Sequence, residues 1–352
     1  MRAPLFLADL GAKAVTALDA ERAHKLTVKM LKLGKGPKVH HKNSRLSVHV
    51  AGLHVDNFLG LAAGFDKNAE APNAMLDLGF GFVEVGAVTP KPQLGNDRPR
   101  VFRLREDGAV INRYGFNNDG LTKIAARLKA RRKKGIVGIN LGANKDSVDR
   151  TEDYVKGVEA LAGLVDFYTV NISSPNTPGL RALQDKASLE DLMARVLAKR
   201  DEAKARTPVF LKIAPDLTDE DKADIADVVT GLSLDGLIIS NTTIERPEVL
   251  RSGQAHERGG LSGRPLFTPS TNVLREFYQR IGKSTPLIGV GGVSSARDAY
   301  EKVLAGASLV QLYTALVYEG PGLPLRILKD LPAFLDADGF DNIDDAIGQG
   351  AL

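Results

Sequence analysis

Short apolar runs alternate with longer segments of helical pattern from about residue 55 onward. Each run is rich in Val, Ile, Leu and Gly and ends in polar or glycine-rich residues. Near-continuous apolar runs are typical of strands that are buried on both faces, as parallel strands are. Helical patterns occupy 122–134, 188–205 and 218–232, and Thr218 is a predicted N-cap of the last. The eight runs cover residues 58–64, 81–89, 135–143, 166–173, 208–214, 235–241, 286–292 and 307–314.

Eight strands that alternate with helices predict an α/β fold of one kind, a (β/α)8 or TIM barrel. A doubly wound open sheet is the main alternative at this point. In a barrel, the active-site residues come from the carboxyl ends of several strands. The runs end in polar sequences such as "AGFDKN", "NISSPN" and "SNTT", so the pattern indicates a catalytic barrel mouth.

Two of the intervals between strands are long. In the first, two short alternating segments flank "EDG", which predicts a β-hairpin at about residues 99–116, laid over the mouth. The second contains a predicted glycine-rich loop at 257–266. Long insertions on a barrel are usually functional, so we expect both segments to serve the site.

The composition excludes several kinds of chemistry. The 352 residues are 43% apolar and 26% charged, which is ordinary for a soluble chain with a sizeable core. There is no cysteine, so disulfides, iron–sulfur clusters, thiolate zinc sites and cysteine nucleophiles are excluded. Five of the six histidines lie in the first 54 residues, so we expect no histidine-based metal site in the barrel.

The charge is distributed unevenly. Residues 1–45 carry ten Lys/Arg and three Asp/Glu, a net charge of +7 within a total of +4. Such a segment favours an anionic partner, either a membrane surface or a polyanion. The apolar start is interrupted by Asp9 and Lys13, so neither a membrane-spanning helix nor a signal peptide is expected there.

Amides, hydroxyls and two lysines gather at the predicted strand ends and in the hairpin. Asparagine and threonine supply donors and acceptors without charge, and lysine can hold an anionic ring. For any one asparagine a turn is the simpler explanation, but five at the mouth weaken it. Lys212 could instead form a Schiff base, as in barrel aldolases. These candidates are Lys67, Asn112, Asn140, Asn171, Ser174, Asn176, Lys212, Asn241 and Thr242.

Ser174 lies in "VNISSPNTPGL" (170–180), at the tip of a predicted strand. Only His256 lies beyond residue 54, so a Ser-His-Asp triad is not expected. As a base, the hydroxyl would need a proton relay and an activated substrate. The plain alternative is a hydroxyl that caps a turn.

Glycines near the end of the chain indicate a phosphate site. "GVGG" (289–292) and "YTA" (313–315) follow the last two predicted strands, where barrels commonly hold a phosphate. The alternative is that the glycines only permit close packing.

Eight motifs in order along the chain resemble dihydroorotate dehydrogenase of class 2, the quinone-dependent and membrane-associated form. The resemblance implies an FMN enzyme of pyrimidine (UMP) synthesis, with one FMN per chain, that oxidises dihydroorotate to orotate and reduces a membrane quinone. Serine at 174, where class 1 relatives have cysteine, separates the two classes. The motifs are residues 62–68, 111–120, 171–181, 211–217, 240–243, 259–266, 289–295 and 311–321.

The resemblance also implies a role for each matching residue. Ser174 is similar to the base that removes a proton from ring carbon 5 of the substrate. The implied orotate contacts are Lys67, Asn112, Arg113, Tyr114, Gly115, Phe116, Asn171, Asn176, Asn241 and Thr242. The implied FMN contacts are Ala63, Gly64, Phe65, Asp66, Lys67, Ala87, Asn140, Asn171, Lys212, Ser240, Gly263, Gly292, Tyr313 and Thr314. The implied quinone tunnel is lined by His24, Arg103 and Tyr313.

The basic N-terminal segment finds a role in the same resemblance. In 17–34, the apolar residues Ala23, Leu26, Met30 and Leu33 recur at helical spacing, with lysines on other faces. We expect a helical extension at 1–42, which borders the quinone tunnel and meets anionic lipid, and an FMN-binding barrel at 43–352. The expected protein is a peripheral monomer on the cytoplasmic face of the cell membrane, with no metal, iron–sulfur cluster or nucleic-acid partner.

Two alternatives stay open at this stage. One is a different phosphate-binding barrel, an isomerase or a Schiff-base aldolase with Lys212 as nucleophile. The other is a nucleic-acid-binding protein with a basic N-terminus, which leaves the polar strand ends unexplained.

Overall fold

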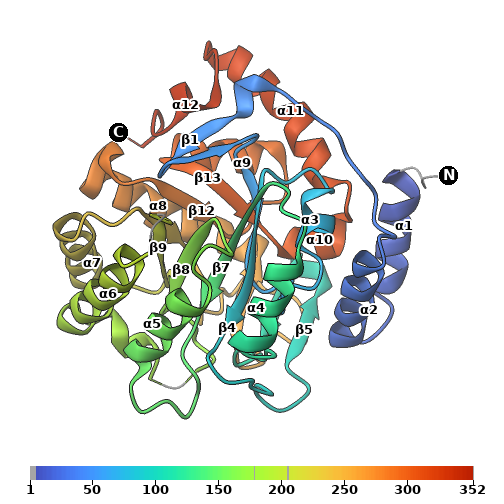
Figure 1. The fold of residues 1–352 in the computed structure, drawn as a ribbon. Helices are drawn as coiled ribbons and strands as arrows, with labels where there is room; N and C mark the ends of the chain where they lie inside the picture. The colour runs from blue at the N-terminus through green and yellow to red at the C-terminus, as the bar shows by residue number, and fades with distance from the viewer. Residues whose placement is uncertain (1–4, 178, 204–205, 352) are drawn as a thin grey trace.

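A closed barrel of eight parallel strands forms the centre of the computed structural model, which describes residues 5–177, 179–203 and 206–351 (Figure 1). Each of the eight predicted apolar runs contains one of these strands, so the barrel prediction is confirmed. Nearly every strand residue is buried, which explains the absence of alternation. The strands are β3 (Leu59–Leu61), β4 (Phe82–Val88), β7 (Ile136–Leu141), β8 (Phe167–Asn171), β9 (Val209–Ile213), β10 (Gly236–Ile239), β12 (Leu287–Val290) and β13 (Ala307–Leu312).

Phenylalanine rings fill the amino-terminal end of the barrel. The Phe167 ring packs edge-to-face against Phe82 and Phe210, with centroid distances of 6.1 and 5.5 Å. Glycines make room for these rings: a Cβ at Gly60 would lie 2.3 Å from the Phe82 ring, and one at Gly138 would lie 2.1 Å from the Phe167 ring. This end is therefore closed, and space for a ligand is left at the carboxyl ends of the strands.

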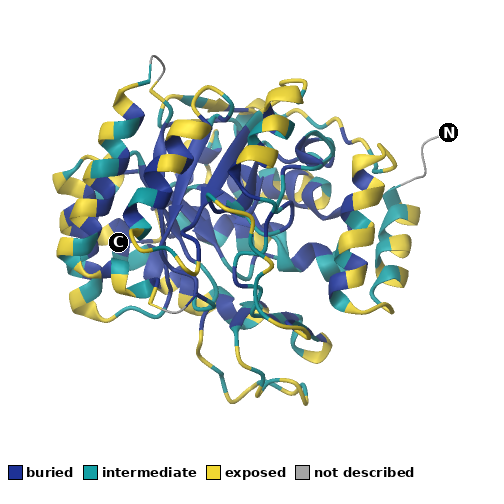
Figure 2. Cartoon of the chain, turned by 60° about the horizontal axis from the view of Figure 1, so that its bottom comes forward, coloured by how far each residue is buried: buried dark blue, intermediate teal, exposed yellow. Residues whose placement is uncertain are grey.

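Helices surround the barrel, with their exposed residues turned outward (Figure 2). The predicted cap of α7 is confirmed, because Thr218 and Asp221 form a reciprocal capping box. The helix predicted at 188–205 begins at Lys186 and ends at Asp201, and residues 204–205 lie outside the described residues. The helices are α3 (Pro72–Leu76), α4 (Leu121–Ala130), α5 (Arg150–Ala160), α6 (Lys186–Asp201), α7 (Asp219–Gly231), α8 (Phe267–Ile281), α9 (Ala296–Leu304), α10 (Thr314–Glu319), α11 (Leu323–Asp338) and α12 (Ile343–Ala346).

The predicted hairpin is confirmed as β5 (Val101–Leu104) and β6 (Ala109–Asn112). The prediction of a loop at 257–266 is wrong in part, because β11 (Gly260–Gly263) pairs with the second edge of β6. Its glycines permit this close approach: a Cβ at Gly263 would lie 2.4 Å from the Gly108 carbonyl oxygen. A further hairpin, β1 (Val48–Val50) and β2 (Leu53–Val55), was not predicted.

The N-terminal segment forms two helices beside the barrel, α1 (Leu5–Val15) and α2 (Ala20–Lys32), drawn in dark blue in Figure 1. Helix α1 contacts α10, and α2 contacts α3 and β5. No helix in the described ranges is long and apolar enough to cross a membrane.

The apolar face predicted for α2 divides in two. Ala23 is buried, whereas Leu26, Met30 and Leu33 are exposed. Val28 and Leu31 take the buried positions instead. The helix therefore has a second apolar face that the barrel leaves uncovered.

Candidate active site

A cavity of about 710 Å³ lies at the carboxyl ends of the strands and extends beneath the hairpin to α1 and α2. The barrel contributes the polar part of its lining, and the two helices contribute apolar side chains. All but two of the predicted site residues border it. They are His24, Ala63, Gly64, Phe65, Lys67, Ala87, Arg103, Asn112, Tyr114, Gly115, Phe116, Asn140, Asn171, Ser174, Asn176, Lys212, Ser240, Asn241, Thr242, Gly263, Gly292, Tyr313 and Thr314.

Asp66 and Arg113 are the two predicted residues that do not line the cavity. The buried Asp66 carboxylate accepts hydrogen bonds from the backbone N–H groups of Glu70 and Ala71, at 2.8 and 2.7 Å. It therefore shapes the turn after β3. The Arg113 guanidinium pairs with Glu257 at 2.8 Å, away from the cavity.

Ser174 borders the cavity and also stabilises its own turn. Its Oγ accepts a hydrogen bond of 3.3 Å from the Asn176 N–H, so the hydroxyl does cap a turn, as the simpler explanation predicted. The side chain is nevertheless part of the cavity lining. Arg181 stabilises this loop. Its Nε donates a hydrogen bond to the Ser173 carbonyl oxygen, and its guanidinium forms an ion pair of 2.9 Å with Asp216.

A chain of hydrogen-bonded amides crosses the floor of the cavity. Asn171 Nδ2 donates to Asn140 Oδ1 at 2.9 Å, and Asn140 Nδ2 donates to Glu84 Oε1 at 2.6 Å. Gln311 Nε2 donates to the other Glu84 oxygen at 2.7 Å. At the far end, Asn241 Nδ2 donates to Asn171 Oδ1 at 3.3 Å. Because both oxygens of Glu84 accept a hydrogen bond from an amide nitrogen, Glu84 determines which way these amides point.

Sequence analysis identified the asparagines but missed Glu84 and Gln311. Both lie within barrel strands and are almost fully buried. The signal was present, since each is the one strongly polar side chain inside an apolar run, in "GFVEVGAVT" and "ASLVQLYT". A buried carboxylate or amide needs a partner, which marks such positions for attention.

The two predicted lysines are buried within the cavity wall. Lys67 Nζ donates to the Gly64 carbonyl oxygen at 2.5 Å and lies 4.0 Å from the centre of the Tyr114 ring. Burial lowers the pKa of Lys67 to about 7, against the charge of Glu21. Burial also lowers the pKa of Lys212, and the Glu84 charge opposes that shift.

Part of the wall is suited to a group with a phosphate and a flat ring. Among the described residues, the N–H groups of Gly291 and Gly292 have no acceptor, and both residues border the cavity. Nor does Lys212 Nζ have a hydrogen-bond partner in that set. Unpaired donors of this kind fit a phosphate and an electron-rich ring. No cluster of acidic and histidine side chains in the described ranges is arranged to hold a metal ion.

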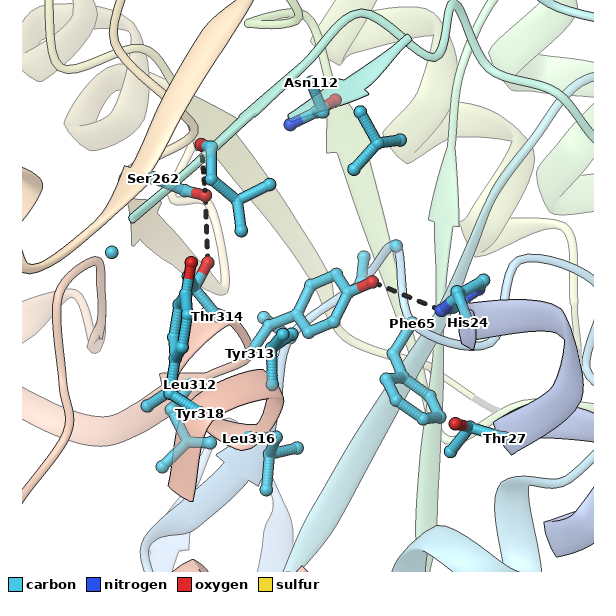
Figure 3. Close-up of a pocket in the computed structure, with 18 of the residues that line it drawn as sticks. His24, Thr27, Phe65, Asn112, Ser262, Leu312, Tyr313, Thr314, Leu316 and Tyr318 are labelled. Atoms are coloured by element: carbon cyan, nitrogen blue, oxygen red, sulfur yellow. Dashed lines mark hydrogen bonds between the residues drawn. The ribbon is translucent and has the colours of Figure 1, made fainter. Parts of the chain in front are cut away.

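Aromatic rings connect the polar part of the cavity with α2. Phe65 packs edge-to-face against both His24 and Tyr313, with centroid distances of 5.3 and 5.6 Å. The Tyr313 hydroxyl lies 3.5 Å from His24 Nδ1 (Figure 3). Burial and the nearby Lys67 lower the pKa of His24 well below its usual range, which favours the neutral ring beside Tyr313.

Arg103 links the hairpin to the turn between α1 and α2. Its Nη1 donates to the Leu18 carbonyl oxygen at 3.0 Å and to that of Thr16 at 2.5 Å. The side chain borders the cavity beside the apolar part of the lining. The three residues predicted for the quinone tunnel thus lie where α2 meets the barrel.

Known proteins similar to this chain agree with that architecture. The sequence profile of the family described as dihydroorotate dehydrogenase matches residues 45–335. The dihydroorotate dehydrogenase (quinone) of Parvibaculum lavamentivorans is 57% identical over 97% of this chain and 98% of its own. That of Allorhizobium ampelinum is 58% identical, over 92% and 91% of the two chains.

A solved structure extends the similarity to three dimensions. The DHODH of Eimeria tenella in complex with ferulenol superposes with a TM-score of 0.91 and is 42% identical, over 94% of this chain and 95% of its own. The ligand-free form gives the same TM-score over 99% of its chain. The relative from Parvibaculum lavamentivorans matches 97% of this chain, which includes the barrel and most of the N-terminal extension. These similarities support the dehydrogenase interpretation over the aldolase and nucleic-acid-binding alternatives. This chain therefore belongs to the dihydroorotate dehydrogenase family, among its quinone-dependent members.

Proposed function

We propose that the cavity is the active site of an FMN-dependent enzyme that oxidises dihydroorotate to orotate, with a membrane quinone as electron acceptor, in pyrimidine (UMP) synthesis. One observation carries this proposal. A continuous cavity joins the amides around Ser174 to the apolar channel beside α1 and α2. A polar anionic substrate and an apolar acceptor can therefore reach opposite ends of one site.

The amide-lined end suits dihydroorotate, a ring that carries amide groups and a carboxylate. Lys67 is positioned to pair with the carboxylate, and Asn112, Asn171, Asn176, Asn241 and Thr242 offer donors and acceptors for the ring. Tyr114, Gly115 and Phe116 also line this cavity. Tyr114 also keeps water from Lys67, so that the ion pair forms in a dry site.

Ser174 is the proposed base of the reaction. Its Oγ takes the proton from ring carbon 5 as a hydride leaves ring carbon 6, and the proton of its own hydroxyl is released through a proton relay to solvent water. The Asn176 N–H donates to this oxygen and so stabilises the negative charge that develops on it. The proton at carbon 5 lies next to a carbonyl, which makes it acidic enough for such a base.

The unpaired donors hold the proposed cofactor, one FMN per chain. When bound, FMN supplies the hydride acceptor and the electrons that the quinone then takes up. Gly263, Gly291, Gly292 and Thr314 would surround its phosphate. Lys212 would stabilise negative charge on its ring, and Asn140 is held for the ring by Glu84.

The N-terminal extension is the proposed route for the quinone. We divide the chain into this extension, residues 1–42, and the catalytic barrel, residues 43–352. His24, Arg103 and Tyr313 border the quinone channel, and the exposed apolar residues of α1 and α2 enter the lipid surface beside basic side chains. The enzyme would act as a peripheral monomer on the cytoplasmic face of the cell membrane.

Anaerobic mixing of the purified protein with dihydroorotate tests the proposal. We expect a yellow protein whose flavin absorption is bleached by dihydroorotate and restored by a soluble quinone. A protein that carries flavin but is not bleached would contradict the substrate, and a colourless protein would contradict the cofactor.

A further inference from the structure

A buried ion cluster joins α2 to the segment before the hairpin. The Glu21 carboxylate, on α2, accepts hydrogen bonds from Arg98 Nη2 at 2.8 Å and from Arg100 Nη2 and Nε at 2.9 and 3.1 Å. Glu21 and Arg100 are both buried. Burial raises the pKa of Glu21, but the hydrogen bonds and charges of Arg100 and Arg98 outweigh it and hold the pKa at about 2. Glu21 therefore keeps its negative charge at neutral pH.

Arg100 passes this contact on to the rim of the substrate site. Its Nη1 donates to the carbonyl oxygens of Leu94 and Asn96, at 2.8 and 2.9 Å. The guanidinium also lies 5.4 Å from the centre of the Tyr114 ring, and Lys67 Nζ lies 4.0 Å from the same centre. One arginine thus binds α2 with one side of its planar group and the 94–96 segment with the other.

Asn96 completes the connection to the catalytic loop. Its Nδ2 donates to the Asn176 carbonyl oxygen at 3.2 Å and to the Arg113 carbonyl oxygen at 3.0 Å. Asn176 in turn donates its N–H to Ser174 Oγ. A series of three side chains therefore connects α2 to the loop that carries the proposed base: Glu21, Arg100 and Asn96.

We propose that Glu21 is a positioning residue for the dihydroorotate end of the site, acting through Arg100 and Asn96 on the loop that carries Ser174 and Asn176. This inference rests on the proposed function. It states that Glu21, a residue of α2, affects substrate binding even when no quinone is present.

The charge of Glu21 has a second effect in the same direction. It favours the protonated form of Lys67, whereas the charge of Arg100 disfavours that form. Loss of the Glu21 charge removes part of what keeps Lys67 protonated for the substrate carboxylate. A neutral replacement therefore disturbs both the geometry of the loop and the cation that holds the substrate.

Substitution of Glu21 tests the inference without quinone. We expect Glu21→Gln to raise the dissociation constant for orotate, measured by calorimetry on the FMN-loaded protein, about tenfold, within the range of ~5-fold to ~150-fold typical of coupled sites. The dihydroorotate concentration that gives half-maximal anaerobic flavin bleaching should rise by the same factor. Glu21→Asp should recover most of the lost orotate affinity.

Glu70→Gln is the matched control. Glu70 forms another ion pair between α2 and the barrel, with Lys32 at 3.1 Å, and within the described residues it has no hydrogen bond or ion pair with the 94–96 segment. We expect Glu70→Gln to leave orotate binding within twofold of the wild type. Equal losses in both variants would mean that loose attachment of α2 is the cause, and would overturn the inference.

Asn96→Ala is a second variant that tests the same inference if Glu21→Gln does not fold. This change leaves the Glu21–Arg100 contact in place and removes only the last link. Weaker orotate binding with normal reoxidation by quinone supports the inference, and unchanged orotate binding contradicts it. Failure of the wild type to bind orotate would instead contradict the proposed function.

Discussion

Lys67 Nζ lies 4.0 Å from the centre of the Tyr114 ring, and no carboxylate among the described residues lies within ion-pair distance of it. An ammonium group in this position has lost most of its water and gained only a ring face and a carbonyl oxygen. This explains why the pKa of Lys67 falls to about 7. The substrate carboxylate would supply the missing negative charge.

Orotate binding should consequently take up a proton above neutral pH. Lys67 is charged below a pH of about 7 and neutral above it, so at pH 8.5 the free protein must gain about one proton to form the ion pair. Calorimetry in buffers of different ionisation enthalpy measures this uptake directly. We expect almost none at pH 6 and none at either pH in Lys67→Arg, which stays charged. Equal uptake at both pH values in the wild type would refute this role for Lys67.

Removal of the Ser174 hydroxyl should slow the first half of the reaction. We expect Ser174→Ala to reduce the rate of flavin bleaching by dihydroorotate ~10²-fold to ~10⁴-fold, the usual contribution of a positioned base. Stopped-flow absorbance under anaerobic conditions gives this rate. FMN content and orotate affinity serve as controls and should be little changed. A variant that is bleached at the wild-type rate would show that another group removes the proton.

Loss of the Glu84 carboxylate should destabilise the barrel floor. Glu84→Ala leaves the amides of Asn140 and Gln311 buried without their acceptor, which costs about 1–3 kcal/mol for each. We expect the free energy of unfolding in urea to fall by about 2–6 kcal/mol, together with weaker FMN binding. Glu84→Gln retains one acceptor oxygen and should lose less. Equal stability of Glu84→Ala and the wild type would contradict this role of the carboxylate.

The exposed apolar residues of α1 should determine vesicle binding. Phe6 and Leu10 are 67% and 48% exposed, next to a basic segment. We expect Phe6→Asp with Leu10→Asp to abolish co-sedimentation with vesicles that contain anionic lipid, and added salt to weaken the wild-type interaction. Val148→Asp is the control, since Val148 is fully exposed on the loop before α5. Vesicle binding that survives the double change would place the membrane surface elsewhere.

The barrel could be predicted from the sequence because its signal is local. Each strand is buried on both faces, so an apolar run appears wherever a strand occurs. β11 escaped prediction for the opposite reason: Gly260–Gly263 has the composition of a loop, and only its partner β6, about 150 residues earlier, makes it a strand.

The site could be predicted only in part. The motifs placed Ser174, Lys67 and the asparagines correctly on the cavity wall. They could not show that Glu84 accepts hydrogen bonds from both Asn140 and Gln311, or that Glu21 reaches Arg100 across 79 residues of sequence. Such pairs are set by packing between elements, which no spacing in the sequence encodes.

The position of β6 in the middle of its small sheet has an energetic consequence. Residues 113–116 follow directly after β6, which pairs with β5 on one edge and β11 on the other, so that its residues up to Asn112 are fixed on both sides. Their conformational entropy is lost when the chain folds. A ligand as small as dihydroorotate makes few contacts. Because these residues are already ordered, the free energy of binding is not reduced by the cost of ordering them.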